Sequence, residues 1–198
     1  MKNTLSLLLL TALLFFSCQQ TSKFNLPPFG ESGIRMVVEI PAGTNHKIEM
    51  DKASGEFKND LENGQIRIVD FLPYPGNYGF IPGTRMDKEK GGDGDALDIL
   101  LISESLPTGT VVEVQPIATL LLKDGGELDT KIIAVPLDSA KRVFHAANFS
   151  DLMITYQPAR RMIEDWFMNY KGPGKMELLG WRDEKHALSE IKKWMIAK

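Results

Sequence analysis

Between Gly33 and Leu137 the chain alternates short apolar runs with turn-forming segments, and this alternation constrains the fold more than any other feature. Five runs are rich in aliphatic and β-branched residues: IRMVVEI, QIRIVDFL, ALDILLI, TVVEVQPIATLLL and KIIAVPL. Turn-formers separate them, as in PAGTN, LENG, PGNYG, KEKGGDG, LPTG and KDGGELD. Short strands joined by long loops predict a small closed barrel.

The periodicity changes after this region, and two amphipathic helices are predicted. From Pro158 to Tyr170, apolar residues recur at three- and four-residue steps, with proline near the first turn. The same pattern runs from Asp183 to the end of the chain. The 198 residues are 43% hydrophobic, which is enough for a sizeable core. We therefore expect one α+β domain that is mainly β, with helices packed on the barrel.

The first residues of the chain form a separate unit. Lys2, the apolar run LSLLLLTALLFFS and then Cys18 have the pattern of a secretory signal peptide. The run is shorter than the ~20 apolar residues of a membrane span. Cys18 is the only cysteine, so no intrachain disulfide can form, and its position resembles the lipidation site of bacterial lipoproteins.

We expect residues 1–17 to be a signal peptide, residues 18–32 to be a lipidated cysteine with a polar tether, and residues 33–198 to be the folded domain. The lipid on Cys18 would then hold an exported protein at a membrane, on the periplasmic or outer-membrane face. The alternatives are an ordinary signal peptide with a leftover thiol, and a cytoplasmic protein.

The acidic residues concentrate in one short loop. The net charge of −3 gives no support to nucleic-acid binding, which usually needs a basic surplus. Within GGDGDALDIL, however, Asp93, Asp95 and Asp98 lie so close in sequence that they would repel one another without a neutralising cation. The glycines let the backbone fold closely around something small, and clustered carboxylates suit a hard divalent cation.

Other interpretations of this loop fit less well. An EF-hand would need Asp or Asn at position 97 and Gly at position 98, and Leu97 and Asp98 break that pattern. A phosphatase with an aspartyl-phosphate intermediate has its D-x-D after a buried strand, whereas here the pair precedes the strand. A solvated acidic turn stays open, although three aspartates that run into an apolar strand disfavour it.

Further charged residues interrupt the predicted strands. Glu39 ends an apolar run, and Lys47 and Glu49 alternate with apolar residues so that both charges share one strand face. The others are Arg67 in QIRIV and the three residues that bracket a glycine-rich turn, Asp124, Asp129 and Lys131. Each alone is an ordinary surface charge. Together they interleave carboxylates with cations, as a site for metal and phosphate requires.

The motifs occur in an order that resembles the family I soluble inorganic pyrophosphatases, from Val37 to Trp181. The matching segments are VVEIPAG with KIEMDKASG, YPGNYGFIPGT, DGDALDIL, KDGGELDTKIIAV, and WFMNYK followed by GW. Ala96 stands where the family usually has proline. Each segment alone is moderately specific, but five in series are a strong indication.

This resemblance implies hydrolysis of inorganic pyrophosphate by metal-activated water, with several Mg²⁺ ions, on an OB-type five-stranded barrel with packed helices. Asp95 would be the catalytic base or would orient the attacking water. The implied metal-binding residues are Asp93, Asp98, Asp124, Asp129 and, through water, Glu39. The implied substrate-binding residues are Lys47, Arg67, Tyr78, Lys131, Tyr170 and Lys171. Tyr74 and Glu49 match positions with supporting roles, and a homo-oligomer is expected because bacterial members of the family typically form one.

Two other functions stay open at this point. One is a phosphohydrolase that acts on nucleotides or polyphosphate. The other is a non-catalytic anchored module that binds divalent metal or polyphosphate. The second would be favoured if an acid of the cluster were replaced, and none of the five aspartates is missing.

Overall fold

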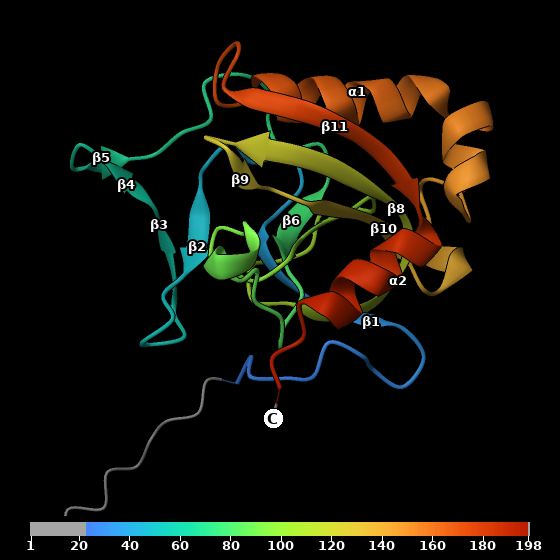
Figure 1. Cartoon of the computed structure of the whole chain (residues 1–198), viewed down its shortest axis with the longest axis horizontal. Helices are drawn as coiled ribbons and strands as arrows, with labels where there is room; N and C mark the ends of the chain where they lie inside the picture. The colour runs from blue at the N-terminus through green and yellow to red at the C-terminus, as the bar shows by residue number, and fades with distance from the viewer. Residues whose placement is uncertain (1–22, 198) are drawn as a thin grey trace, which may run out of the picture.

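The computed structural model describes residues 23–197, so the predicted signal peptide and Cys18 lie outside the described residues. Figure 1 shows a strongly curved sheet with α1 (Gln157–Asn169) along one side and α2 (Glu184–Lys193) beside another. The strands are β1 (Ile34–Ile40), β2 (Ile48–Met50), β3 (Phe57–Asn59), β4 (Leu61–Glu62), β5 (Gln65–Ile66), β6 (Asn77–Phe80), β7 (Asp98–Leu101), β8 (Val111–Asp124), β9 (Glu127–Leu128), β10 (Lys131–Pro136) and β11 (Met176–Asp183). Among the described residues, no helix is both long and apolar enough to cross a bilayer.

Five strands close on themselves into a ring. Their order is β1-β6-β7-β10-β8, and β8 pairs with β1 again. Strands β7 and β10 are parallel to each other, whereas the remaining pairs of the ring are antiparallel. Strand β11 extends the sheet beyond β8. The predicted class, a mainly β α+β domain with five central strands and packed helices, is confirmed.

The ring buries both faces of its central strands. Along β10, Ile133 and Val135 join the core cluster that contains α1, while Ile132 and Ala134 join the cluster that contains α2. A strand that is covered on both faces reads as a continuous apolar run, and KIIAVP is such a run. Each face of β10 is therefore covered by a core cluster to which one of the two helices contributes.

Most of the sequence-based elements are confirmed, with shifted ends. Strands β1, β7, β8 and β10 lie within or across the predicted runs. Both helices form. Asp183 caps α2 by accepting from the backbone N–H of His186, and α2 ends at Lys193 rather than at the chain end.

The prediction of a strand over QIRIVDFL is wrong. Gln65 and Ile66 pair with β4 in a small hairpin that extends away from the ring (Figure 1), and Ile68 forms an isolated bridge with His46. Beyond this hairpin Phe71 and Leu72 are exposed, so the alternation of this run does not reflect a buried sheet face. Sequence inspection also missed β6, which lies in the turn-rich PGNYGFIPG segment, and β11.

The missed strand β6 depends on a glycine that lies against its neighbour. A Cβ on Gly79 would lie 2.0 Å from the carbonyl oxygen of Val37 on β1. Glycine is therefore required here for close approach of two strands rather than for a turn.

We predict that Gly79→Ala destabilises the protein by about 3 kcal/mol, because backbone atoms of β1 must move to admit the methyl group. Urea unfolding measures this change. Gly64→Ala is the control: Gly64 has φ +78° and open space around it, so only backbone strain of about 1 kcal/mol is expected. Equal losses in the two variants would contradict the close-approach explanation.

Candidate active site

A cavity of about 410 Å³ opens beside the ring. All twelve residues to which the resemblance gives a catalytic, metal-binding or substrate-binding role line it, and they come from separate parts of the chain. They are Glu39, Lys47, Arg67, Tyr78, Asp93, Asp95, Asp98, Asp124, Asp129, Lys131, Tyr170 and Lys171. Glu49 also lines the cavity, whereas Tyr74 lies in an adjoining pocket that shares Lys47 and Arg67.

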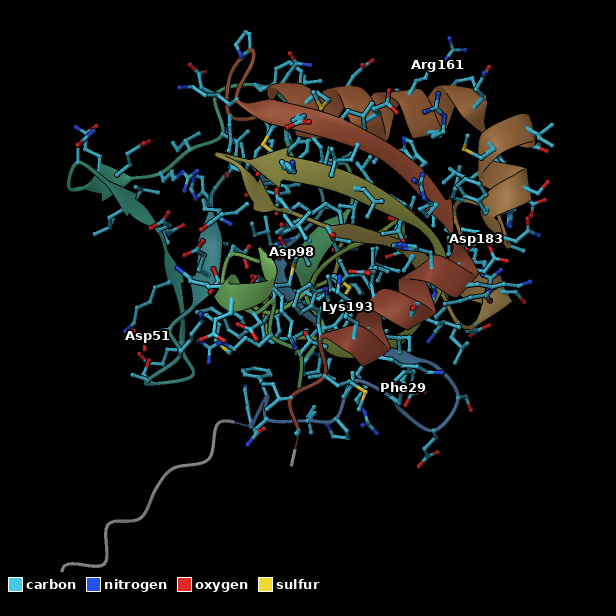
Figure 2. The ribbon with its side chains drawn as sticks, viewed as in Figure 1. Phe29, Asp51, Asp98, Arg161, Asp183 and Lys193 are labelled. Atoms are coloured by element: carbon cyan, nitrogen blue, oxygen red, sulfur yellow. The ribbon has the colours of Figure 1, made fainter. Side chains whose placement is uncertain are left out.

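Strand register brings the central residues together. Asp98 begins β7 and Lys131 begins β10, and the parallel pairing of these strands sets the two residues directly beside each other. Asp124 ends β8, and Asp129 follows the short turn to β10. Asp98 therefore lies near the middle of the molecule, at one end of the ring (Figure 2).

Lys131 forms the best-connected ion pair of the site. Its Nζ lies 2.5 Å from Asp98 Oδ2, 2.5 Å from Asp129 Oδ1 and 3.0 Å from the Tyr78 hydroxyl. The side chain is fully buried, and burial by itself would lower the pKa of the ammonium. Asp129 and Asp98 reverse that effect and raise the pKa of Lys131 well above its usual value. Lys131 is therefore a fixed positive charge in the cavity.

Other lysines pair with further acids of the cavity. Lys52 forms an ion pair with Asp95, and Lys171 forms one with Asp124. Lys47 Nζ lies 3.1 Å from Glu49 Oε1. Lys52 was not among the predicted site residues, although it stands in the KIEMDKASG segment that carries the family resemblance. A lysine on an exposed turn gives no sequence signal by itself, because the fold alone brings it to Asp95.

The acidic set has the donor chemistry of a divalent-cation site. Asp129 Oδ2 is buried and has no hydrogen-bond partner. Burial, together with the charges of Asp98 and Asp95, raises the pKa of Asp93. Among residues 23–197, no three acidic, histidine or cysteine side chains converge as a preformed metal cluster, since lysines hold several of the carboxylates. Carboxylate oxygens without nitrogen or sulfur donors fit a hard cation such as Mg²⁺.

The tyrosines combine packing with a polar tip. The Tyr170 ring stacks on Trp166, with ring centres 4.8 Å apart and planes 13° apart, and Tyr170 also reaches the cavity. Burial raises the pKa of Tyr78 and of Tyr170, so both hydroxyls stay protonated. Protonated hydroxyls at these positions can donate hydrogen bonds to phosphate oxygens.

Glu39 is held at the edge of the cavity by the neighbouring hairpin. Its Oε1 accepts from the backbone N–H of Met50 at 2.9 Å. Burial raises the pKa of Glu39 from 4.5 to about 7, and the Met50 bond offsets only part of this shift. In the metal-free protein, Glu39 therefore titrates near neutral pH.

The raised pKa of Glu39 predicts a pH-dependent stability. The folded protein keeps the Glu39 proton up to a pH of about 7, whereas the unfolded chain releases it near 4.5. The unfolding free energy should therefore fall as the pH rises through this window, and Glu39→Gln should remove the fall. In urea titrations with EDTA, the variant should gain about 2–3 kcal/mol relative to the natural protein between pH 4.5 and 8.

Glu113→Gln is the matched control for this prediction. Backbone N–H groups of Ser32 and Glu31 lower the pKa of Glu113, so its contribution to stability is lost as the pH falls. Its variant should therefore be less stable than the natural protein above pH 5 by a constant amount, and the slope of stability against pH in that window should stay unchanged. Parallel curves for Glu39→Gln and the natural protein would show that Glu39 does not titrate there.

Comparison with known proteins identifies the same family that the sequence motifs resemble. The inorganic pyrophosphatase family matches residues 36–197. The chain is 38% identical over 162 residues to the inorganic pyrophosphatase of Sulfolobus acidocaldarius, which covers 80% of this chain and 87% of that protein. The relative from Thermus thermophilus is 35% identical over 167 residues, which cover 80% of this chain and 86% of the relative.

Solved structures agree with the sequence relatives. An inorganic pyrophosphatase from Neisseria gonorrhoeae superposes with a TM-score of 0.70 at 35% identity and covers 85% of this chain and 94% of its own. A type I inorganic pyrophosphatase from Toxoplasma gondii reaches a TM-score of 0.76 at 30% identity, with 85% of this chain and 82% of that chain covered. The matched span includes every residue that lines the cavity. The chain therefore belongs to the inorganic pyrophosphatase family.

Proposed function

We propose that the lysine- and aspartate-lined cavity is where the chain hydrolyses inorganic pyrophosphate to two phosphates. The activity itself follows from family membership, so the chain is an inorganic diphosphatase. The roles proposed for individual residues rest on one observation. All twelve predicted side chains come from separate segments and line the same cavity. A substrate with several negative charges needs this mixture of cations and acids.

The family depends on metal ions for activity, and we propose that the metal here is Mg²⁺. Asp93, Asp98, Asp124 and Asp129 would hold the ions, with Glu39 at the edge of the set. The unpartnered buried oxygen of Asp129 and the raised pKa of Asp93 support this assignment. When bound, divalent cations neutralise the substrate and lower the pKa of a coordinated water.

The residues of the chain supply the proton acceptor and the electrostatic stabilisation. Water attacks one phosphorus, the bond to the bridging oxygen breaks, and the second phosphate leaves. Asp95, whose side chain is 64% exposed, would accept the proton of the attacking water or orient it. The phosphate-binding cations and hydroxyls would stabilise the charge that develops on the transferring and leaving groups, and they are Lys47, Arg67, Tyr78, Lys131, Tyr170 and Lys171.

We also propose that the protein is an exported lipoprotein anchored through Cys18. The support is the sequence alone: an apolar run of signal-peptide length followed by a single cysteine. Metabolic labelling with a fatty-acid analogue tests this proposal, because a Cys18→Ser variant should lose the label and leave the membrane fraction. An unlabelled natural protein in the cytoplasm would overturn it.

We further interpret the five-strand ring as an OB-type barrel and propose that the protein is a homo-oligomer. Support for association is the exposure of Ile154 and Met162, which are 77% and 70% exposed on or beside α1. Light scattering of the purified protein measures the mass, and a monomer at micromolar concentration would contradict the proposal.

We predict that Asp95→Asn lowers phosphate release from pyrophosphate by at least ~100-fold, because an amide cannot take the proton of the attacking water. The measurement is steady-state phosphate release with Mg²⁺, and EDTA should abolish the activity of the natural protein. Asp138→Asn removes an equal charge at an exposed helix cap outside the cavity and should leave the rate nearly unchanged.

Phosphate release from other substrates distinguishes pyrophosphate hydrolysis from a broader phosphohydrolase activity. Release from ATP or tripolyphosphate at the rate seen with pyrophosphate would indicate a broader phosphohydrolase. Full activity of Asp95→Asn would refute the role given to Asp95.

A further inference from the structure

A segment that precedes the family match is fastened to the domain at several points. We call residues 24–33 the N-terminal strap; the family match begins only at residue 36. The Arg35 guanidinium donates to two strap carbonyls, at 2.8 and 3.1 Å. The Glu113 carboxylate accepts from three consecutive strap N–H groups at 2.9 to 3.0 Å. The strap is therefore part of the folded domain rather than a free tether.

The far end of the strap is buried behind the wall of the active-site cavity. Phe24 is 3% exposed, and its ring meets Phe57 edge to face, with ring centres 5.1 Å apart. The same apolar cluster contains Met50, Phe80 and Ala96, and these three residues line the cavity. The ring of Phe24 thus belongs to the same apolar cluster as side chains that line the cavity.

The wall that Phe24 supports is a small hairpin. Strands β2 and β3 form a two-stranded sheet of their own, and an isolated hairpin of this size is marginally stable. Met50 and Phe57 are directly paired across it. Figure 2 shows Asp51 where the chain turns between these strands, at the outer edge of the molecule. Backbone bonds of Lys47 and the Met50–Glu39 bond restrain the base of the hairpin. Packing of Met50 and Phe57 in the cluster of Phe24 restrains its outer part.

This hairpin carries several groups of the proposed site. Lys47 and Glu49 lie at its start, and Lys52, just past β2, pairs with Asp95. The backbone N–H of Met50 also holds Glu39. A shift of the hairpin would displace these groups together relative to the aspartates of the loop before β7.

We infer that Phe24 is a positioning residue for pyrophosphate hydrolysis, acting through Phe57 and Met50 on the hairpin that presents Lys47 and Lys52. This inference rests on the proposed roles of the cavity residues. It gives the strap, which lies outside the family match, a part in the reaction.

The test compares two phenylalanines of the same strap in the full chain. Phe29 packs against the other core cluster, which contains residues of α2, and Figure 2 shows it on that side of the molecule. Phe24→Ala should lower kcat/KM for pyrophosphate by roughly 10-fold per folded molecule, mainly through KM, because the hairpin carries Lys47. Phe29→Ala should change kcat/KM by less than about twofold, since its contacts do not reach the hairpin. Urea unfolding of both variants gives the folded fraction.

Two further variants separate positioning from general destabilisation. Phe24→Leu should recover part of the lost kcat/KM, because it fills part of the same space. In a Lys47→Ala background, Phe24→Ala should have much less than its tenfold effect, since the group it positions is gone. Equal losses in Phe24→Ala and Phe29→Ala, or a folded Phe24→Ala with natural KM, would overturn the inference. These outcomes would leave the proposed function intact, which only the Asp95 and substrate experiments test.

Discussion

The buried ion pairs of Lys131 are the interaction on which the rest of the structure depends. A fully buried ammonium is tolerated only when acids surround it, and here Asp98 and Asp129 both lie 2.5 Å away. Those two acids are in place because β7 and β10 run parallel in register and because the β8–β9 hairpin returns the chain to β10 at Asp129. Closure of the five-strand ring therefore fixes the geometry of the site, and the charges of the site in turn restrain the ring.

The same balance of charge extends across the cavity. Lysines from three distant segments pair with the acids: Lys52 after β2, Lys131 on β10 and Lys171 after α1. Carboxylates at such density repel one another, so each pair offsets a cost that folding imposes. The proposed site would bind a multiply charged anion together with cations. Its acids and lysines stabilise one another, and either set alone would be repulsive.

The sequence predicted the charged residues of the site more completely than the strands that carry them. Acids within GGDGDALDIL and lysines interleaved on apolar runs are visible without coordinates, and the order of motifs links them. Strand β6 was hidden because Gly79 lowers strand propensity, and its requirement for close approach to Val37 exists only in three dimensions. The QIRIVDFL run predicted a strand that does not form, since all of its apolar residues except Val69 are exposed instead of covering a core. Lys52 and Phe24 contribute through contacts between distant segments, which no local pattern reveals.

The central claim is that carboxylates and cations gathered by the ring bind pyrophosphate together with metal. The most direct measurement is calorimetric titration of the full chain with methylenediphosphonate, a pyrophosphate analogue whose bridging carbon resists hydrolysis, in Mg²⁺ and in EDTA. The account predicts binding at least ~10-fold tighter with Mg²⁺, because the ions offset repulsion between the analogue and the aspartates. Equal affinity in EDTA would contradict it, since the lysines and arginine alone would then suffice to hold the substrate.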